Sequence, residues 1–199
     1  MEAAKTAAET FHDFASRARN RKTQVTGEIV VTSVEIISPL MLKAISKVRE
    51  DHPHTNIRYI VSGRLLNLAH GEAHIAIRAG TKPTHPDNVV RPFFNLFSTL
   101  YAHANYVDKY GLPESLEDFD NHQFILHQEP QRTAFFQWLE SHTSDENIVL
   151  RSQNQRVLME SISMGLGIGF MPQIIAQSNP DLYHVMVPQS NWFIPLWLV

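Results

Sequence analysis

The first eighty residues alternate between strand-like and helix-like patterns of apolar positions. Strands are predicted where β-branched residues gather or apolar and polar positions alternate, at 28–33, 57–61 and 74–78. Helices are predicted between them, one with apolar residues at helical spacing from Ile37 to Val48 and a shorter one over 64–71. This order predicts parallel strands joined by right-handed crossovers.

Beyond a polar, proline-containing loop at 81–88, a second α/β segment follows. Its predicted strands are one or two at 89–103, then 123–127, 147–152 and 167–172, and its predicted helices are at 106–111 and 154–165. The chain ends in the apolar segment IPLWLV, which belongs in a sheet rather than in solvent. The predicted fold class is therefore α/β, with two Rossmann-like lobes in series and the last strand returning to the first lobe.

Capping residues predict two of the helix starts. Ser38 is the expected N-cap of the longer helix, because Pro39 follows it at the first helical position. Ser115 and Asp118 resemble a capping box ahead of a short helical segment in the second half of the chain.

Composition narrows the class of protein. The 199 residues are 43% apolar with a formal net charge of −3, which excludes intrinsic disorder and argues against bulk nucleic-acid binding by this chain. There is no cysteine, so disulfides and thiolate chemistry are excluded. Neither a run of about 18 apolar residues nor a signal-peptide pattern occurs, so we expect a cytoplasmic protein with no membrane contact.

The first 26 residues differ from the body of the chain. They carry five basic and three acidic residues, whereas the remainder carries 12 basic and 17 acidic residues. An apolar stripe at helical spacing runs from Ala4 to Ala18 and ends at a basic break. An isolated helix of this length is marginal in water, so we expect a second copy of the chain to cover the stripe; the alternative is a helix folded back on its own domain.

Metal, cofactor and catalytic motifs do not emerge. His70 and His74 are four residues apart, but Gly71 stands where a zinc-protease helix needs Glu, so we expect no metal site. The glycines at 165, 167 and 169 follow a predicted helix and precede a predicted strand, the reverse of a dinucleotide-binding motif, so we expect no cofactor. No nucleophile motif or pair of carboxylates with separate roles is present, so we do not expect an enzyme.

A binding crevice at the carboxyl ends of the strands remains as the expected site. Hydroxyls beside helix starts suit an anion, because free N–H groups and the helix dipole point there, and an arginine can form two hydrogen bonds with a carboxylate. For each serine the alternative is a helix cap, and for each arginine a salt bridge. The positions that we select are Ser33, Ser62, Arg64, Arg78, His127 and Ser152.

Five segments follow one another along the chain: GEIVVTSVEIISPLMLKAISKVREDHP, SGRLLNLAHGEAHIAIRAG, SLEDFDNHQFILH, MGLGIGFMP and PLWLV. In this order they resemble the effector-binding domain of LysR-type transcriptional regulators, and the resemblance covers nearly the whole chain. It implies a fold like that of type 2 periplasmic binding proteins, a small-molecule effector in a central cleft between the lobes, here expected to be an organic anion, and a homodimer or tetramer. One residue departs from the family pattern, because His74 stands where the family usually has Asp.

The resemblance also implies how the chain is organised. Residues 1–26 would be the end of a linker helix with its basic break, 27–102 with 185–199 the first lobe, and 103–184 the second. The helix-turn-helix domain is missing from this sequence, so the chain is expected to sense an effector and to bind DNA only through that missing domain. The alternative is a solute-binding protein of a transport system, against which the missing export signal and the basic N-terminal helix argue.

Overall fold

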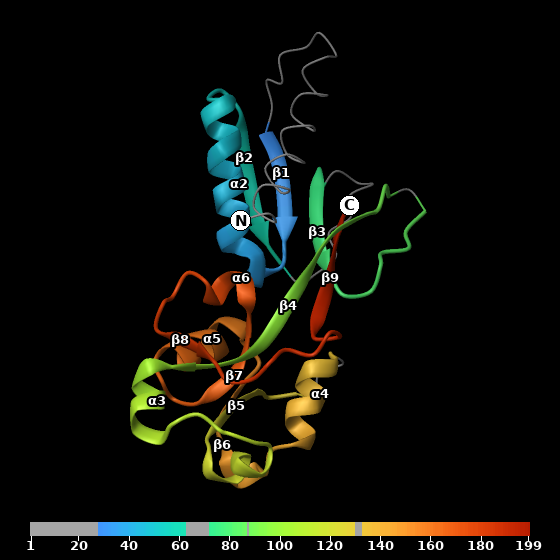
Figure 1. Cartoon of the computed structure of the whole chain (residues 1–199). Helices are drawn as coiled ribbons and strands as arrows, with labels where there is room; N and C mark the ends of the chain where they lie inside the picture. Colours follow the sequence, from blue (N-terminus) through green and yellow to red (C-terminus); the bar gives the residue numbers. More distant parts are fainter. Residues whose placement is uncertain (1–27, 63–71, 87, 130–132) are drawn as a thin grey trace. The chain divides into compact units, whose positions relative to one another are not determined.

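A computed structural model describes residues 28–62, 72–86, 88–129 and 133–199 of the chain (Figure 1). The helices expected over 4–18 and 64–71, together with Arg64 and His70, lie outside the described residues.

The chain divides into two compact units. The first contains the described residues of 1–94 together with Pro195–Val199, and the second is Asn95–Ile194. The two junctions fall inside the strands β4 (Arg91–His103) and β9 (Phe193–Leu198), each of which contributes to both units. The sequence interpretation placed these junctions after residues 102 and 184, eight and ten residues from where the two units divide.

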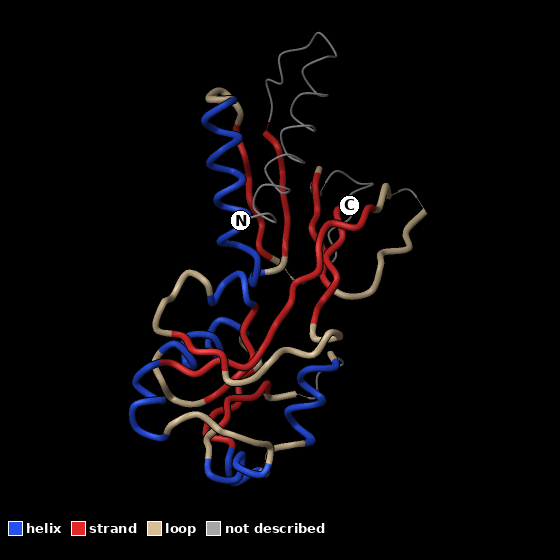
Figure 2. Tube along the Cα trace, viewed as in Figure 1, coloured by secondary structure: helices blue, strands red, loops and turns tan. Residues whose placement is uncertain are grey.

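The sheet of the first unit is parallel at its centre. Strand β1 (Glu28–Ser33) lies between β2 (Asn56–Val61) and β3 (Ile75–Ala79) and is parallel to both. Strand β9 adds antiparallel to β3 (Figure 2). In this pairing Arg78 stands opposite Trp197. Both the parallel pairing and the return of the apolar terminal strand to this sheet are as the sequence predicts.

Helix α2 (Ser38–Asp51) packs on this sheet through Leu40, Met41, Ala44 and Val48, the apolar stripe seen in the sequence. A 3-10 turn, η1 (Glu35–Ile37), leads directly into it. Because this turn already brings the chain into the helical conformation, Ser38 is the first helical residue and Ile37 takes the N-cap position. The prediction of Ser38 as the N-cap is therefore wrong, although Pro39 does occupy the first turn.

The second unit has a mixed sheet. Strands β4, β7 (Ile168–Pro172), β5 (Phe124–His127) and β6 (Ile148–Ser152) are neighbours in that order. Strand β4 is antiparallel to β7, the others are parallel, and β8 (Leu182–His184) pairs with β4. Four helices accompany these strands in the described ranges: α3 (Ala104–Tyr110), α4 (Ala134–Ser141), α5 (Gln155–Ser163) and α6 (Gln173–Ala176).

The sequence analysis missed α4, α6 and β8. Helix α4 carries a detectable signal, because Phe135 and Leu139 stand one helical turn apart and are both buried. They join an aromatic core in which the rings of Phe170 and Trp192 meet edge-on, 5.0 Å apart. Helix α6 and β8 are only four and three residues long, too short for a periodic pattern.

The glycine run at the end of α5 has the structural role that its order predicts. Gly165 has a φ of +77°, which ends the helix. A Cβ on Gly167 would lie 2.9 Å from the carbonyl oxygen of Gln123, so the chain passes too close for any side chain. The run is thus a helix stop followed by a closely packed strand.

The capping box proposed at Ser115 and Asp118 is wrong. A 3-10 turn, η3 (Glu117–Asn121), forms there with Leu116 at the N-cap position and no capping side chain. Asp118 lies inside the turn, and its carboxylate accepts hydrogen bonds from the backbone N–H of Glu114 and the side chain of Asn121. Among the helices of the described ranges, none has the length and apolar character needed to span a membrane.

Candidate functional site

The carboxyl end of β1 carries a chain of three hydroxyl groups. Ser33 is fully buried, its Oγ lies 2.6 Å from the hydroxyl of Tyr59 on β2, and it donates to the carbonyl of Val34 at 3.0 Å. The Tyr59 hydroxyl in turn donates to Ser38 Oγ at the start of α2, at 3.1 Å. The Ser33 hydroxyl therefore already joins β1, β2 and the start of α2.

Ser62 lies beside Ser33, as the sequence predicts for the ends of neighbouring parallel strands. Its backbone N–H donates to the Ser33 carbonyl at 3.0 Å, which continues the β1–β2 ladder by one residue.

Arg78 lies near the carboxyl end of β3 in a different environment. The residue is only 5% exposed, and its two terminal guanidinium nitrogens are buried with no hydrogen-bond partner in the described part of the chain. Burial lowers the pKa of Arg78 from its usual value, because it penalises the charged form. An arginine nevertheless stays protonated in a protein, so a buried positive charge is held here, and no described residue forms an ion pair with it.

Strand register places Ser33 and Arg78 on opposite faces of the sheet. Ser33 pairs with Ile77, and side chains alternate along a strand, so the next residue of β3 points the other way. The residue of β1 that shares the Arg78 face is Thr32, the partner of Ala76. The sequence analysis grouped Ser33 with Arg78 and did not select Thr32, because strand ends alone do not reveal the face.

His127 and Ser152 end β5 and β6 in the second unit, where they are partners across the parallel pair. Both ring nitrogens of His127 contact backbone oxygens, Nδ1 that of Glu129 at 3.0 Å and Nε2 that of Gln153 at 3.1 Å. Ser152 Oγ accepts from the N–H of Asn154 at 3.1 Å. The structure brings these two predicted residues together, but both already form polar contacts with the backbone of the loops that follow β5 and β6.

His74 takes the place of the acid expected from the family pattern. Its ring nitrogen Nδ1 accepts a hydrogen bond from the backbone N–H of Val30 at 2.9 Å. The backbone N–H of His74 donates to the Val30 carbonyl at 2.8 Å. The imidazole thus supplies the acceptor that holds the start of β3 against β1.

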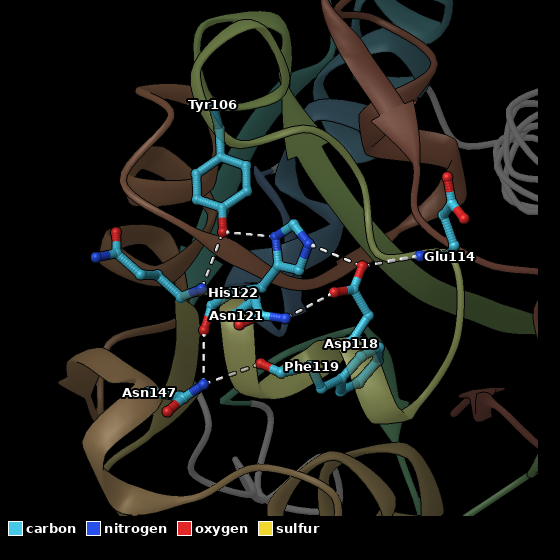
Figure 3. A network of polar contacts seen from close by, with 8 residues as sticks. Tyr106, Glu114, Asp118, Phe119, Asn121, His122 and Asn147 are labelled. Atoms are coloured by element: carbon cyan, nitrogen blue, oxygen red, sulfur yellow. Dashed lines mark hydrogen bonds and ion pairs between the residues drawn. The ribbon is translucent and has the colours of Figure 1, made fainter.

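A second polar cluster, not found from the sequence, lies in the second unit (Figure 3). The hydroxyl of buried Tyr106 on α3 contacts Nδ1 of buried His122 at 3.1 Å and accepts from the Gln123 N–H at 2.9 Å. The other ring nitrogen, Nε2, faces the Asp118 carboxylate at 3.6 Å. Burial raises the pKa of Tyr106, and hydrogen bonding from Asn121 and then Glu114 lowers the pKa of Asp118.

Asn147 closes this cluster from the turn before β6. Its side-chain amide donates to the carbonyls of Phe119 and His122 at 2.9 and 3.0 Å (Figure 3). Every polar group that the cluster brings together is paired within it, so we interpret it as a structural brace for η3 and β5. Within the described ranges, no three His, Asp or Glu side chains gather closely enough to hold a metal ion.

The sequence matches the family described as the LysR substrate binding domain over residues 22–199. The chain belongs to this family. LysR substrate-binding domains are the ligand-sensing regulatory domains of transcriptional regulators and form no enzyme family, and their fold is the type 2 periplasmic-binding-protein-like fold predicted above. The alternative of a transport solute-binding protein is not favoured.

Solved structures of LysR-type regulators share this fold. The regulatory domain of CrgA from Neisseria meningitidis is 21% identical with a TM-score of 0.68, over 87% of this chain and 88% of that one. A second CrgA structure is 19% identical with a TM-score of 0.71, over 98% of this chain and 67% of that one. The effector domain of AmpR from Pseudomonas aeruginosa is 12% identical with a TM-score of 0.63, over 86% and 85% of the two chains. No curated protein matches the sequence.

Proposed function

We propose that this LysR substrate-binding domain senses a small organic anion, a carboxylate, as the effector of a transcriptional regulator. The observation that carries the proposal is Arg78, whose guanidinium is buried near a strand end without a partner in the described part of the chain. A buried, unpaired cation destabilises the folded protein, and an anionic ligand that supplies the missing charge removes that cost.

The other selected residues support this proposal to different degrees. Ser62 lies at the same strand edge of the first unit. The Ser33 hydroxyl is engaged with Tyr59 and Val34. In the second unit, Ser152 Oγ accepts from the Asn154 N–H, and the hydroxyl also has a proton that can be donated to a ligand. His127 is engaged through both ring nitrogens, Nδ1 with the backbone of Glu129 and Nε2 with the carbonyl of Gln153, and would have to give up one of these contacts to reach a ligand.

The finer features of a regulator are part of the same proposal. The domain would form a homodimer or tetramer and would act on DNA through a helix-turn-helix domain of a longer protein. Sedimentation of the chain at micromolar concentration tests self-association, and a monomer at every concentration would contradict it.

A ligand screen tests the effector class. Small carboxylates, neutral sugars and amines are compared by the Tm of the chain, where a ligand at 100 times its Kd adds about 2.7 kcal/mol of stability. We expect the stabilising compounds to be carboxylates and their effect to disappear in Arg78→Met. Stabilisation by neutral or cationic compounds that persists in Arg78→Met would overturn the proposal.

A further inference from the structure

Two neighbouring strands of the first unit carry buried polar atoms without partners on the same sheet face. On β1 it is Thr32, fully buried, whose Oγ1 has no hydrogen-bond partner within the described ranges. On β3 the residue is Arg78, whose two terminal guanidinium nitrogens are also buried without a hydrogen-bond partner in the described ranges. Because Thr32 pairs with Ala76, the two side chains are diagonal neighbours whose Cα atoms lie about 8 Å apart.

The chemistry of these groups points to one kind of ligand. The guanidinium of Arg78 only donates hydrogen bonds, and the hydroxyl of Thr32 has a proton to donate. Donors that share a sheet face and have no acceptor among the described residues suit an acceptor-only group, and the positive charge favours an anion. A planar carboxylate matches the guanidinium with two parallel hydrogen bonds and leaves lone pairs for the hydroxyl.

We infer that Thr32 and Arg78 together bind the carboxylate of a ligand at the carboxyl edge of this sheet, on the face away from Ser33. This inference rests on the proposed effector-sensing function. It adds a second residue that contacts the ligand, Thr32, and it specifies the face of the sheet on which the ligand binds. Both residues stand one position before the end of their strand, so the ligand needs to pass only the last residue of each.

Two described neighbours of Arg78, on β9 and in the loop after β3, do not supply the missing negative charge. On the neighbouring strand β9, the residue paired with Arg78 is Trp197, whose Nε1 donates to the Gly80 carbonyl at 2.7 Å. The ammonium of Lys82 lies over the Trp197 ring, 5.9 Å from its centroid, and adds a second positive charge. An aromatic ring and a lysine favour an anion from outside the chain.

Arg58, another arginine on the same face of the sheet, differs from Arg78 because it has an ion-pair partner within the chain. Arg58 on β2 pairs with Val30, so it shares the face of Thr32, but it forms an ion pair with Glu28 at 2.9 Å and is largely exposed. The chain thus provides a carboxylate for the exposed arginine and none, in the described residues, for the buried one. Arg58 is therefore a matched control.

The experiment measures the Tm of the 199-residue chain against sodium acetate, with sodium chloride at equal ionic strength as the reference. In the unsubstituted chain we expect a rise of about 3–6 °C at ten times the Kd of acetate, which continues with the logarithm of the acetate concentration. Arg78→Met and Thr32→Val should lose this rise, while Arg58→Met and Ser33→Ala should keep it. Without acetate, Arg78→Met should raise the Tm by about 2–4 °C, because it removes an unpaired buried charge.

The outcomes separate this inference from the proposed function. If Arg78→Met abolishes the acetate effect and Thr32→Val does not, the two-residue site is wrong while the anionic effector stands. If acetate behaves like chloride with the unsubstituted chain, or inorganic phosphate alone stabilises it, the carboxylate site is wrong. Should Thr32→Val fail to fold, Thr32→Ser keeps the hydroxyl and Thr32→Ala removes it; equal acetate effects in these two variants would overturn the role of Thr32.

Discussion

Ser33 and Arg78 lie near the ends of adjacent parallel strands and point to opposite faces of one sheet, because Ser33 pairs with Ile77. The two residues consequently have different tasks. Ser33 takes part in a hydroxyl network that connects two strands and the start of α2, whereas Arg78 has its terminal nitrogens unpaired in the described part of the chain.

Ser33→Ala separates folding from ligand binding. Loss of the hydroxyl removes the contact with Tyr59, so we expect the free energy of unfolding to fall by about 0.5–1.5 kcal/mol. Because Ser33 faces away from Arg78, the acetate dependence of the Tm should not change. Urea denaturation and the acetate titration measure the two effects. A variant of normal stability with weakened acetate binding would show instead that Ser33 contacts the ligand.

Tyr106→Phe tests the brace in the second unit. The substitution leaves the partly buried Gln123 N–H and the buried His122 Nδ1 without their hydroxyl partner, which we expect to cost about 1–3 kcal/mol of unfolding free energy. Tyr110→Phe is the matched control on the same helix, because Tyr110 is 41% exposed, and it should change stability by less than about 0.5 kcal/mol. Equal effects of the two substitutions in urea denaturation would disprove the brace.

Asp118→Asn should change how stability depends on pH. Hydrogen bonding from Asn121 and Glu114 lowers the pKa of Asp118 in the folded protein. The carboxylate therefore stabilises the fold above the unfolded pKa of about 3.9, and this contribution is lost as pH falls through the lower folded value. We expect Asp118→Asn to be less stable than the unsubstituted chain at neutral pH and the difference to shrink in acid.

The control for Asp118 is Asp120→Asn, a substitution of an exposed aspartate in the same turn. Unfolding is measured by urea between pH 7 and the lowest pH at which the chain stays folded. A stability difference for Asp118→Asn that is constant over this range would mean that the carboxylate charge contributes nothing.

Gly167→Ala tests the close approach after α5. The new Cβ would lie 2.9 Å from the Gln123 carbonyl oxygen, a backbone atom that cannot move without shifting β5, so we expect a loss of about 1–3 kcal/mol. Gly80→Ala is the comparison, since a Cβ there meets no atom within 4 Å and the cost comes only from its φ of +92°. If Gly167→Ala unfolds at the same urea concentration as the unsubstituted chain, the packing at this glycine is looser than described.

The sequence by itself determined the α/β class, most of the described strands and the helices α2, α3 and α5. These follow from periodic apolar positions, which are a local property of the chain. It also determined that the terminal segment IPLWLV belongs in a sheet, since so apolar a strand is stable only when it is paired and covered, and the resemblance to the LysR family implied that it returns to the first sheet. The strand-end residues followed from a general rule of parallel sheets, so Ser33, Ser62 and Arg78 could be selected as candidates.

Only the tertiary structure decided what those candidates do. The face on which each side chain lies depends on strand register, which joins residues more than 40 positions apart, such as Thr32 and Ala76. The partners also come from distant segments: Tyr59 engages Ser33, whereas Thr32 and the terminal nitrogens of Arg78 have no partner in the described part of the chain. A buried polar group becomes either a brace or a binding site according to whether folding brings it a partner, and no local pattern of residues contains that information.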